Sequence, residues 1–363
     1  MIDGAAPPVP AHRRRQVLSV LTADNASRVS DLANHLGVSP MTVRRDLSEL
    51  QRQGLVKRVH GGAILPPSSI GKPERPTAVG RVAILVPNLD FDWPSVARGA
   101  ETAANWRNLK LLLRSDANDG INELPALSQL FATGDVIGVG AAIDTNNPHS
   151  AEVLDWLAVQ EKPFVLIETQ PPAGHHKRTF ETVVTDHAKG THEAAQHLWE
   201  LGHRRLGCVI RRTSPAADRI AAGWLAACDE LGIPAEQTFV EVVPDHCNTQ
   251  FMPAAQAVVT RCLTAGVTGL LVHSDREAIG LAEQLERRGR HVPEDISIVS
   301  YDDELAPLYS PALTAVRPAG SALGTAAVDL LVARQAAPHR PIHHVTISPE
   351  LIVRESTSAP PPR

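Results

Sequence analysis

Two sets of residues in this sequence have types and spacings that could do chemistry. The first is a run of hydroxyl, thioether and guanidinium side chains between positions 39 and 60. Arginine can read guanine edges or neutralise phosphates, and serine and threonine hydroxyls can contact either. The second is a series of carboxylates and arginines, with a tryptophan, that follow short apolar runs between positions 90 and 303. Such groups give directional hydrogen bonds to hydroxyls, and a ring covers an apolar face, so the second set suits a polyhydroxylated ligand.

A predicted helix that begins at Pro40 positions the first set. Ser39 is suited to cap this helix, and proline is tolerated at the first helical position because its missing N–H would be unpaired there anyway. Val43, Leu47 and Leu50 recur at i, i+4 and i+7 and form the buried stripe. The outward face and the segment that follows supply the predicted DNA contacts, which are Ser39, Met41, Thr42, Arg44, Arg45, Ser48, Arg58 and His60.

A second predicted helix lies just before this one. Ser30 is suited to cap it, and the helix is expected to run to Leu36. Gly37 can end it in the left-handed conformation, and Val38 is the apolar residue inside the turn. The pattern predicts two helices joined by a tight turn.

The stretch GVSPMTVRRDLSELQRQGLVKRVHGGA resembles the winged helix-turn-helix of DeoR-family transcriptional regulators. The resemblance implies a recognition helix, a short β-wing and double-stranded operator DNA as the partner. The alternative is that Arg44, Arg45 and Arg58 form an ordinary solvated basic face.

The charge distribution favours nucleic acid at the N-terminal end only. Residues 1–65 hold nine Lys/Arg and five Asp/Glu, a net of +4, while the whole chain is −5, so the rest carries −9. No apolar run approaches the ~20 residues needed to span a bilayer, and the N-terminus lacks the apolar stretch of a signal peptide. The four cysteines include no C-x-x-C pair. These features predict a cytoplasmic protein with no membrane partner.

From position 81 the pattern changes to short apolar runs that alternate with helical segments. Strand–helix alternation with continuous apolar strands predicts an α/β fold of parallel sheets covered on both faces. Nine strands suit two doubly wound lobes better than one sheet. The predicted strands are 82–86, 109–113, 136–143, 164–167, 182–184, 206–210, 239–243, 269–272 and 296–300.

Polar residues follow these strands, at the edge where open parallel sheets bind ligands. For any single carboxylate, capping a helix or lying at a solvated loop tip is an equally good interpretation, so the repetition carries the prediction. The residues at these strand ends include Asp90, Trp93, Arg114, Glu168, Asp186, His187, Arg211, Asp275, Asp302 and Asp303.

Two further stretches resemble the LacI-type effector domain, a relative of periplasmic sugar-binding proteins. They are TVVTDHAKGTHEAAQHLWELGHRRLGCV and GLLVHSDREAIGLAEQLERRGRHVPEDISIVSYDDELAPLYSPALTAVRP. The resemblance implies ligand contacts from Glu168, Asp186, Asp275 and Asp302, with His246 near the family's aromatic position.

One position departs from that family's pattern. The family's ligand-gripping arginine stands five or three residues before a glycine, whereas Arg219 stands four residues before Gly223. Arg219 is the candidate, and Arg211 or Arg212 could substitute for it. The family's usual DNA reader and its hinge helix are absent, and a DeoR-type wing and a proline-rich linker stand in their place.

These features together predict a domain order. The two ends are predicted to be disordered, and the ligand-binding domain has two lobes that each draw on two segments. The boundaries are 1–12 (tail), 13–65 (winged helix-turn-helix), 66–80 (linker), 81–356 (ligand-binding domain; first lobe 81–186 and 317–338, second lobe 187–316 and 341–355) and 357–363 (tail).

The favoured hypothesis is a ligand-responsive transcriptional regulator, in most cases of this kind a repressor. It would act as a homodimer on operator DNA, respond to a sugar or sugar derivative, and need no cofactor. The alternatives are a carbohydrate-acting enzyme, for which Asp186 with His187 is the one tempting dyad, and a non-regulatory sugar-binding protein. His192 and His197 stand five apart, which does not present two metal ligands on one helix face.

Overall fold

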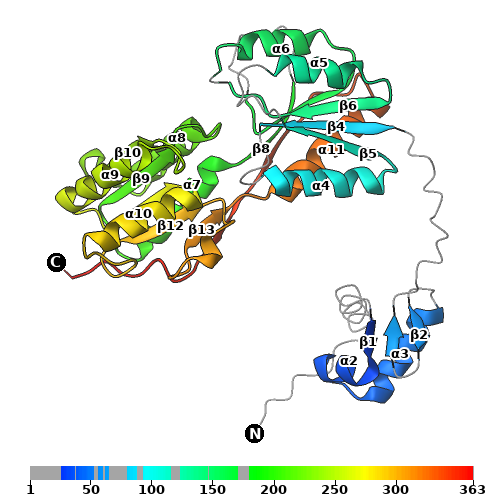
Figure 1. The fold of residues 1–363 in the computed structure, drawn as a ribbon, viewed down its shortest axis with the longest axis horizontal. Coiled ribbons are helices and arrows are strands. Elements are labelled where there is room, and N and C mark those ends of the chain that lie inside the picture. The colour runs from blue at the N-terminus through cyan, green and yellow to red at the C-terminus, as the bar shows by residue number, and fades with distance from the viewer. Residues whose placement is uncertain are drawn as a thin grey trace. The chain divides into compact units, whose positions relative to one another are not determined.

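The computed structural model describes residues 26–36, 38–52, 56–59, 62–64, 80–87, 93–115, 123–145, 147–170 and 180–362. The chain divides into two compact units, Met1–Thr77 and Ala78–Arg363 (Figure 1). The division falls within the predicted linker, whose residues 66–79 lie outside the described part of the chain.

The described residues of the first unit form two helices and a three-stranded antiparallel sheet. Strand β3 lies in the middle of the sheet, in the order β1-β3-β2, so β2 and β3 form the predicted wing and β1 adds a strand that was not predicted. The elements are β1 (Ala26–Arg28), α2 (Val29–Leu36), α3 (Pro40–Arg52), β2 (Lys57–Val59) and β3 (Gly62–Ile64).

The start of α3 is confirmed and the start of α2 is corrected. The Thr42 N–H donates to Ser39 Oγ at 3.2 Å, so Ser39 caps α3 as predicted. Ser30, however, is the second residue of α2, and its hydroxyl donates to Asp31 instead. Strand β1 runs directly into this helix at Val29, which leaves no position for a cap at Ser30.

The core of the first unit is the predicted stripe. Val43 and Leu47 are fully buried and Leu50 nearly so, and they pack with Leu32 and Val56. The i, i+4, i+7 spacing therefore sets which face of α3 is turned away from this core.

In the second unit, the first lobe is a six-stranded parallel sheet in the order β14-β8-β7-β6-β4-β5. Helices α5 and α6 cover one face and α4 and α11 cover the other (Figure 1). The elements are β4 (Arg81–Val86), α4 (Trp93–Trp106), β5 (Lys110–Ser115), α5 (Leu124–Ala132), β6 (Val136–Ala141), α6 (Ser150–Ala158), β7 (Phe164–Ile167), β8 (Glu181–Thr185), α11 (Gly320–Ala336) and β14 (His344–Ile347).

The second lobe is also six-stranded, in the order β10-β9-β11-β12-β13-β15, and only β15 is antiparallel to its neighbour among these described strands. Helices α7 and α8 pack on one face, and α9 and α10 pack on the other. The elements are α7 (His187–Glu200), β9 (Leu206–Arg211), α8 (Ala217–Glu230), β10 (Thr238–Val243), α9 (Phe251–Ala265), β11 (Gly269–His273), α10 (Asp275–Arg287), β12 (Ser297–Tyr301), β13 (Thr314–Arg317) and β15 (Glu350–Ile352), with short turns η1 (Ala235–Gln237) and η2 (Ala306–Leu308).

All nine predicted strands are confirmed, and the two-lobed α/β architecture with them. Strands β13, β14 and β15 were not predicted, and the assignment of 341–355 to the second lobe is wrong in part. Strand β14 pairs with β8 in the first lobe, and only β15 lies in the second. The β14 segment is a polar edge strand whose side chains are at most half-buried, so it lacks the continuous apolar run of a central strand.

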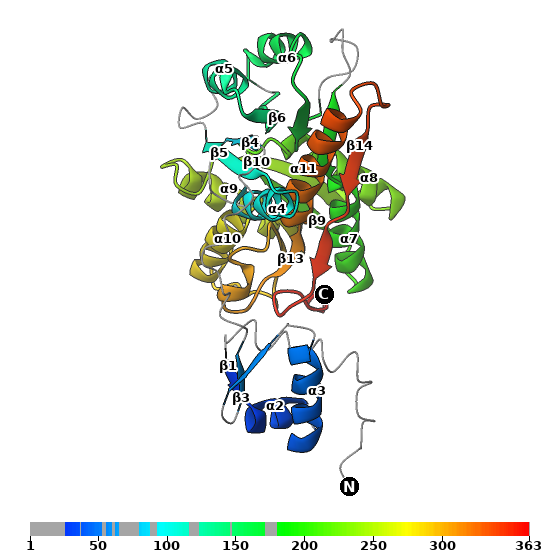
Figure 2. The same ribbon diagram turned by 90° about the vertical axis from the view of Figure 1, so that its right-hand side faces the viewer.

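The chain passes between the lobes three times within residues 180–362. The crossings follow β8, β13 and β14 (Figures 1 and 2). Two of them are tied together, because the Asp186 N–H donates to Ile347 O at 2.9 Å. Hinges between lobes form at short crossings of this kind.

The C-terminal segment is ordered, which corrects the prediction of a disordered tail. The Ser358 N–H donates to Ser297 Oγ at 3.0 Å, and Ser358 O lies 2.9 Å from His203 Nε2. Thr357 Oγ1 lies 2.9 Å from His197 Nε2. The prediction of disorder rested on composition alone. In the structure, hydroxyl and carbonyl groups of this proline-rich segment form hydrogen bonds that hold residues 357–362 on the second lobe.

Helices α4 and α11 of the first lobe lie side by side (Figure 1), and two glycines lie where their backbones approach most closely. A Cβ atom at Gly99 would lie 1.9 Å from Ser321 O, and one at Gly324 would lie 1.9 Å from Val96 O. The two backbones can approach this closely because neither residue has a side chain. Within the described residues, no helix is both long and apolar enough to cross a membrane.

Candidate functional site

The outward face of α3 carries the first candidate set. Met41 is 70% exposed, and Arg44, Arg45 and Ser48 are also exposed. The Ser48 hydroxyl donates to Arg44 O at 2.8 Å, so it is partly used by its own helix. Among the described side chains of α3, this face presents two unburied guanidinium groups beside a thioether, as the sequence predicts.

Of the other predicted DNA contacts, two use their hydroxyls within the protein and two are not fully described by the structure. Ser39 is exposed but its hydroxyl caps α3, and Thr42 is half-buried with its hydroxyl 2.9 Å from that of Ser39. The side chain of Arg58 and the whole of His60 lie outside the described residues.

Part of the second candidate set gathers, together with residues that were not predicted, where the carboxyl ends of the two sheets approach each other. We call it the interlobe cluster, and it comprises Glu168, His187, Arg211, Arg219, Asp245, His273, Tyr301 and Asp302.

Glu168 is the member that the first lobe contributes. It follows β7 with a φ of 54°, in the left-handed region that non-glycine residues rarely adopt. Its carboxylate accepts from the Thr185 N–H at 3.1 Å and from the Thr185 hydroxyl. Across the lobe boundary, Arg219 Nη2 donates to Glu168 O at 2.8 Å and to Oε2 at 3.3 Å.

The charge on Glu168 is strongly stabilised. Burial alone would raise the pKa of this carboxyl, but the hydrogen bond and charge of His187, the charge of Arg219 and the Thr185 hydroxyl lower the pKa to about 2. The group is therefore ionised at neutral pH and is an acceptor only.

The ionised state of Glu168 fixes the proton of its neighbour. His187 Nε2 lies 3.4 Å from Glu168 Oε2, and His187 Nδ1 lies 2.8 Å from the Tyr301 hydroxyl. Because Glu168 can only accept, Nε2 carries the proton, and Nδ1 accepts from Tyr301 when the ring is neutral. Burial raises the pKa of Tyr301 well above its usual value, which keeps its hydroxyl protonated.

His273 and Asp302 follow the central strands of the second lobe. Burial lowers the pKa of His273 well below its usual value, and its Nδ1 has no partner among the described residues. Asp302, with a φ of 98°, lies 4.0 Å from His273 Nε2 and is 10% exposed. Burial, and then the charge of Asp275, raise the pKa of Asp302 to about 8 although Arg211 opposes this.

Arg211 ends β9 beside the end of β10. Its Nε lies 3.5 Å from Asp245 Oδ1, and the Thr213 hydroxyl donates to the same carboxylate at 2.7 Å. Arg211 is 7% exposed. Burial of a guanidinium is tolerated where a carboxylate accompanies it.

Two predicted ligand residues are used by the chain itself. Asp275 accepts from the Ser300 hydroxyl at 2.5 Å and from the Leu305 and Ala306 N–H groups at 2.7 and 3.1 Å. Asp186 caps α7, accepting from the Lys189 N–H at 3.0 Å. These carboxylates hold the loop after β12 and the start of α7.

The remaining predicted ligand residues lie apart from these contacts. His246 is exposed, and its N–H donates to the buried Glu277 at 2.9 Å. Trp93 is half-buried at the start of α4. Arg114 is exposed near the end of the edge strand β5, and Asp90 lies outside the described residues.

The sequence prediction missed the central pair of the cluster. His273 and Tyr301 directly follow the predicted apolar runs 269–272 and 296–300, and neither was singled out from the sequence. Their position at strand ends was the available signal, but the Tyr301–His187 contact depends on α7 packing against this edge. Asp245 follows Val243 by two residues and was likewise not singled out.

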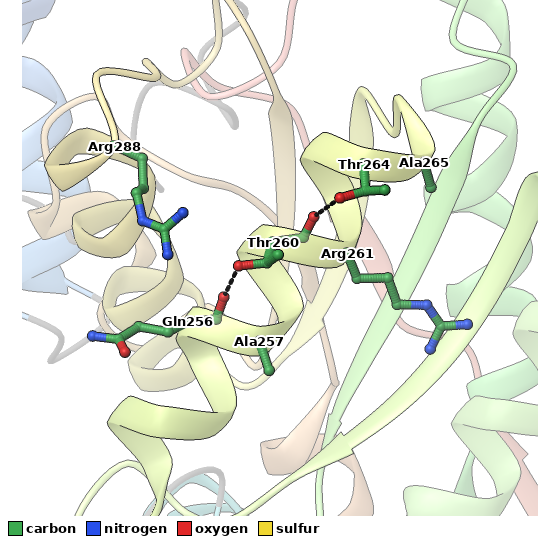
Figure 3. A pocket seen from close by; sticks show the side chains of 7 residues that line it. All are labelled: Gln256, Ala257, Thr260, Arg261, Thr264, Ala265 and Arg288. Atoms are coloured by element: carbon green, nitrogen blue, oxygen red, sulfur yellow. Dashed lines mark hydrogen bonds between the residues drawn. The ribbon is translucent and has the colours of Figure 1, made fainter.

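A separate surface hollow lies on the outer side of α9 and shares no residue with the interlobe cluster (Figure 3). Its hydroxyls are turned back to their own helix, since Thr260 donates to Gln256 O and Thr264 to Thr260 O. Arg261 points away from them and pairs with Glu241 at 2.5 Å. This hollow therefore offers few free polar groups.

The chain matches known proteins in both units. A model of the periplasmic binding protein-like domain matches residues 195–357, and a model of the DeoR-like helix-turn-helix domain matches residues 13–69. The Arg81–Ile352 architecture and the exposed α3 face together define a ligand-responsive DNA-binding transcriptional regulator.

Individual relatives agree with this class. An uncharacterised HTH-type transcriptional regulator from the aml 5′ region of Streptomyces limosus is 30% identical over 348 residues, covering 91% of this chain and 94% of the relative. The arabinose metabolism transcriptional repressor of Geobacillus stearothermophilus is 27% identical over 337 residues, covering 90% of each. The crystal structure of a LacI family transcriptional regulator from Enterococcus faecium with bound ribose is 25% identical, with a TM-score of 0.62, and covers 77% of this chain and 99% of that one. The chain belongs to the LacI family of HTH-type transcriptional regulators.

Proposed function

We propose that this regulator is a sugar-responsive repressor in which ligand binding between the lobes alters operator binding by α3. The observation that carries the proposal is the contact of Arg219 with Glu168, which brings charged groups of both lobes together at the carboxyl edges of their sheets. Parallel sheets bind ligands at that edge. A ligand held by both lobes favours one arrangement of the lobes, and the crossings after β8, β13 and β14 let them move.

The effector is proposed to be a sugar. Two relatives support this, one by its name as an arabinose metabolism repressor and one by its bound ribose. Carboxylates, an arginine and an imidazole also suit hydroxyl groups. The proposed ligand-binding residues are Asp90, Trp93, Arg114, Glu168, Asp186, Arg219, His246, Asp275 and Asp302.

Within that set the proposed roles differ. Arg219 and Asp302 would contact the sugar, because Arg219 Nη1 is buried without a described partner and Asp302 accepts no hydrogen bond from a described residue. Asp275 and Asp186 would position the site, since their oxygens already hold the chain.

The DNA-binding head is proposed to be of the DeoR type. The matched model of residues 13–69 and the three-stranded sheet around β3 support a winged head. The proposed DNA contacts are Ser39, Met41, Thr42, Arg44, Arg45, Ser48, Arg58 and His60.

We further propose that the protein is a cytoplasmic homodimer and not an enzyme. Two heads on two half-sites give a regulator both affinity and a geometry that lobe closure can disturb. The dyad suggested by the sequence finds no support, since Asp186 caps α7 and His187 bonds Tyr301 and Glu168. Among the described residues no hydrogen bond joins Asp186 to His187.

The test is a thermal-shift screen of the full chain against pentoses, hexoses and disaccharides, followed by DNA binding with each sugar that stabilises the protein. A ligand at 100 times its Kd adds about 2.7 kcal/mol to the stability of the domain that binds it. Asp302→Ala should abolish the shift and leave DNA binding unresponsive. A sugar that is consumed during incubation would support the enzyme alternative instead.

A further inference from the structure

We propose that the effector is an uncharged polyhydroxylated compound and that the site discriminates against phosphorylated sugars. The inference rests on the proposed function, because it concerns the ligand class of the same interlobe site. It follows from how the arginines of the interlobe cluster are already matched by carboxylates of the chain.

The first of these arginines is Arg219. Its Nη2 donates twice to Glu168, once to the carbonyl oxygen at 2.8 Å and once to the carboxylate at 3.3 Å. Glu168 is held in place from its own lobe by the Thr185 N–H. Its negative charge is therefore fixed beside the guanidinium, and a phosphate that approached Arg219 would also approach this carboxylate.

The second arginine is Arg211, which is matched in the same way. Asp245 lies 3.5 Å from it and is itself held by two contacts from the Thr213 hydroxyl, at 2.7 and 2.9 Å. The pair is formed between the ends of the neighbouring strands β9 and β10. Each arginine of the cluster is therefore already paired with a carboxylate of the chain, Arg219 with Glu168 and Arg211 with Asp245.

The histidines of the cluster are not available as free cations for a phosphate. His273 is neutral at pH 7 because burial lowers its pKa, and both nitrogens of His187 are already occupied by Glu168 and Tyr301. Arg114 is outside the interlobe cluster, because it lies in the edge strand β5. Strands β4 and β6 separate β5 from β7, the strand that Glu168 follows.

The groups that remain unsatisfied favour hydroxyls. Arg219 Nη1 and His273 Nδ1 are buried without a described partner, and the Asp302 carboxyl is nine-tenths buried without a hydrogen bond from a described residue. A sugar hydroxyl both donates and accepts, so it can satisfy an arginine N–H and a carboxyl or imidazole in turn. A phosphate dianion only accepts, and it would face the carboxylates of Glu168 and Asp245 in a site with low solvent access.

The experiment compares each sugar with its own phosphate ester by isothermal titration of the full chain. The probes are ribose and ribose 5-phosphate, arabinose and arabinose 5-phosphate, and glucose and glucose 6-phosphate. The free sugar that binds is expected to bind roughly tenfold or more tightly than its ester, the scale of one like-charge contact. An ester that binds as tightly as the free sugar, or more tightly, overturns the inference while leaving the proposed sugar sensor intact.

A charge variant makes the test specific to the cluster. Glu168→Gln removes the counter-ion of Arg219 and should narrow the preference for the free sugar by improving the affinity for the ester. Glu241→Gln is the matched control, because it removes a carboxylate from a surface pair with Arg261 outside the cluster, and it should leave the preference unchanged. If the Glu168→Gln variant has the circular dichroism of the wild type and still prefers the free sugar over its ester by the same factor, the role given to Glu168 is contradicted. If no free sugar and no ester in the panel binds, both this inference and the proposed function fail.

Discussion

Arg219 of the second lobe is bonded through one nitrogen to both the main chain and the side chain of Glu168 in the first lobe. Arg219 lies in the first turn of α8, and Glu168 lies directly after β7 in a left-handed conformation. The contact joins two lobes that the chain also connects by three crossings. It places Glu168, whose pKa is lowered to about 2, at the boundary between the lobes that the proposed ligand would occupy.

Breaking this contact should loosen the lobes without unfolding either of them. Arg219→Ala removes the hydrogen bonds to Glu168 and leaves a buried carboxylate with less compensation, which costs about 1–3 kcal/mol. Urea unfolding of the second unit measures the loss. Arg212→Ala, an exposed neighbour of the cluster, is the control and should stay within about 0.5 kcal/mol of wild type. Equal stability of Arg219→Ala and wild type would show that the contact does not hold the lobes.

Removing Arg45 should separate DNA binding from ligand binding. Arg45 is exposed on α3, and if it contacts a base edge, Arg45→Ala loses about 1–3 kcal/mol of operator affinity. Fluorescence anisotropy with DNA selected from a random pool measures this loss. Sugar affinity should be unchanged, and Arg287→Ala at the end of α10 should alter neither activity. A variant of Arg45 that loses sugar binding while folded would contradict the division of labour between the units.

The stability of the second lobe should depend on pH because of Asp302. Burial, and secondly Asp275, raise the pKa of this carboxyl from 3.8 to about 8, so the folded chain keeps a proton that the unfolded chain releases. This group therefore makes stability fall as pH rises from about 4 towards 8. The Asp302→Asn side chain has the shape of the neutral carboxyl and does not titrate. The urea midpoint of this variant should therefore exceed that of the wild type by a margin that grows between about pH 5 and pH 8.

The control for this prediction is a carboxyl shifted in the opposite direction. The pKa of Asp295 is lowered, first by the hydrogen bond from the His291 N–H, so its contribution changes only in more acidic solution. Asp295→Asn should differ from wild type by a constant amount over the same range. A constant difference for Asp302→Asn as well would mean that Asp302 is ionised in the folded protein.

The contact between α4 and α11 should be intolerant of any side chain at its glycines. A Cβ at Gly99 would come within 1.9 Å of Ser321 O, which is backbone and cannot rotate away. Gly99→Ala should therefore destabilise the first lobe by about 1–3 kcal/mol or more, measured by thermal unfolding. Gly134→Ala is the matched control, because nothing lies within 4 Å of its Cβ position. Similar melting temperatures for the two variants would contradict this close packing.

How far the sequence could predict the structure depended on whether a residue's role was local. The stripe of Val43, Leu47 and Leu50 follows from helical spacing alone, and it fixed the exposed face of α3 correctly. The central strands could also be predicted, because they are continuous apolar runs. The segment that forms β14 was not predicted as a strand and was assigned to the wrong lobe, since a polar edge strand has no such run and its partner β8 is distant in sequence.

The roles of the candidate-site residues were harder to predict from the sequence, for a related reason. A carboxylate after a strand looks the same in sequence whether it binds a ligand, as proposed for Asp302, or caps a helix, as Asp186 does. Which of the two occurs depends on the backbone that follows it. The counter-ion pairs of Arg219 and Arg211 join residues that are distant in sequence, so only the folded chain reveals them.

One titration shows whether a sugar held between the lobes changes DNA binding by α3. The full chain is bound to a duplex selected from a random pool, and a sugar that stabilises the protein is added while fluorescence anisotropy is followed. The sugar is expected to release the DNA, with a coupling of about 1–3 kcal/mol, and Asp302→Ala is expected to abolish the release. A sugar that binds the wild-type chain to saturation and leaves its DNA affinity unchanged would contradict the proposal that ligand binding between the lobes alters operator binding.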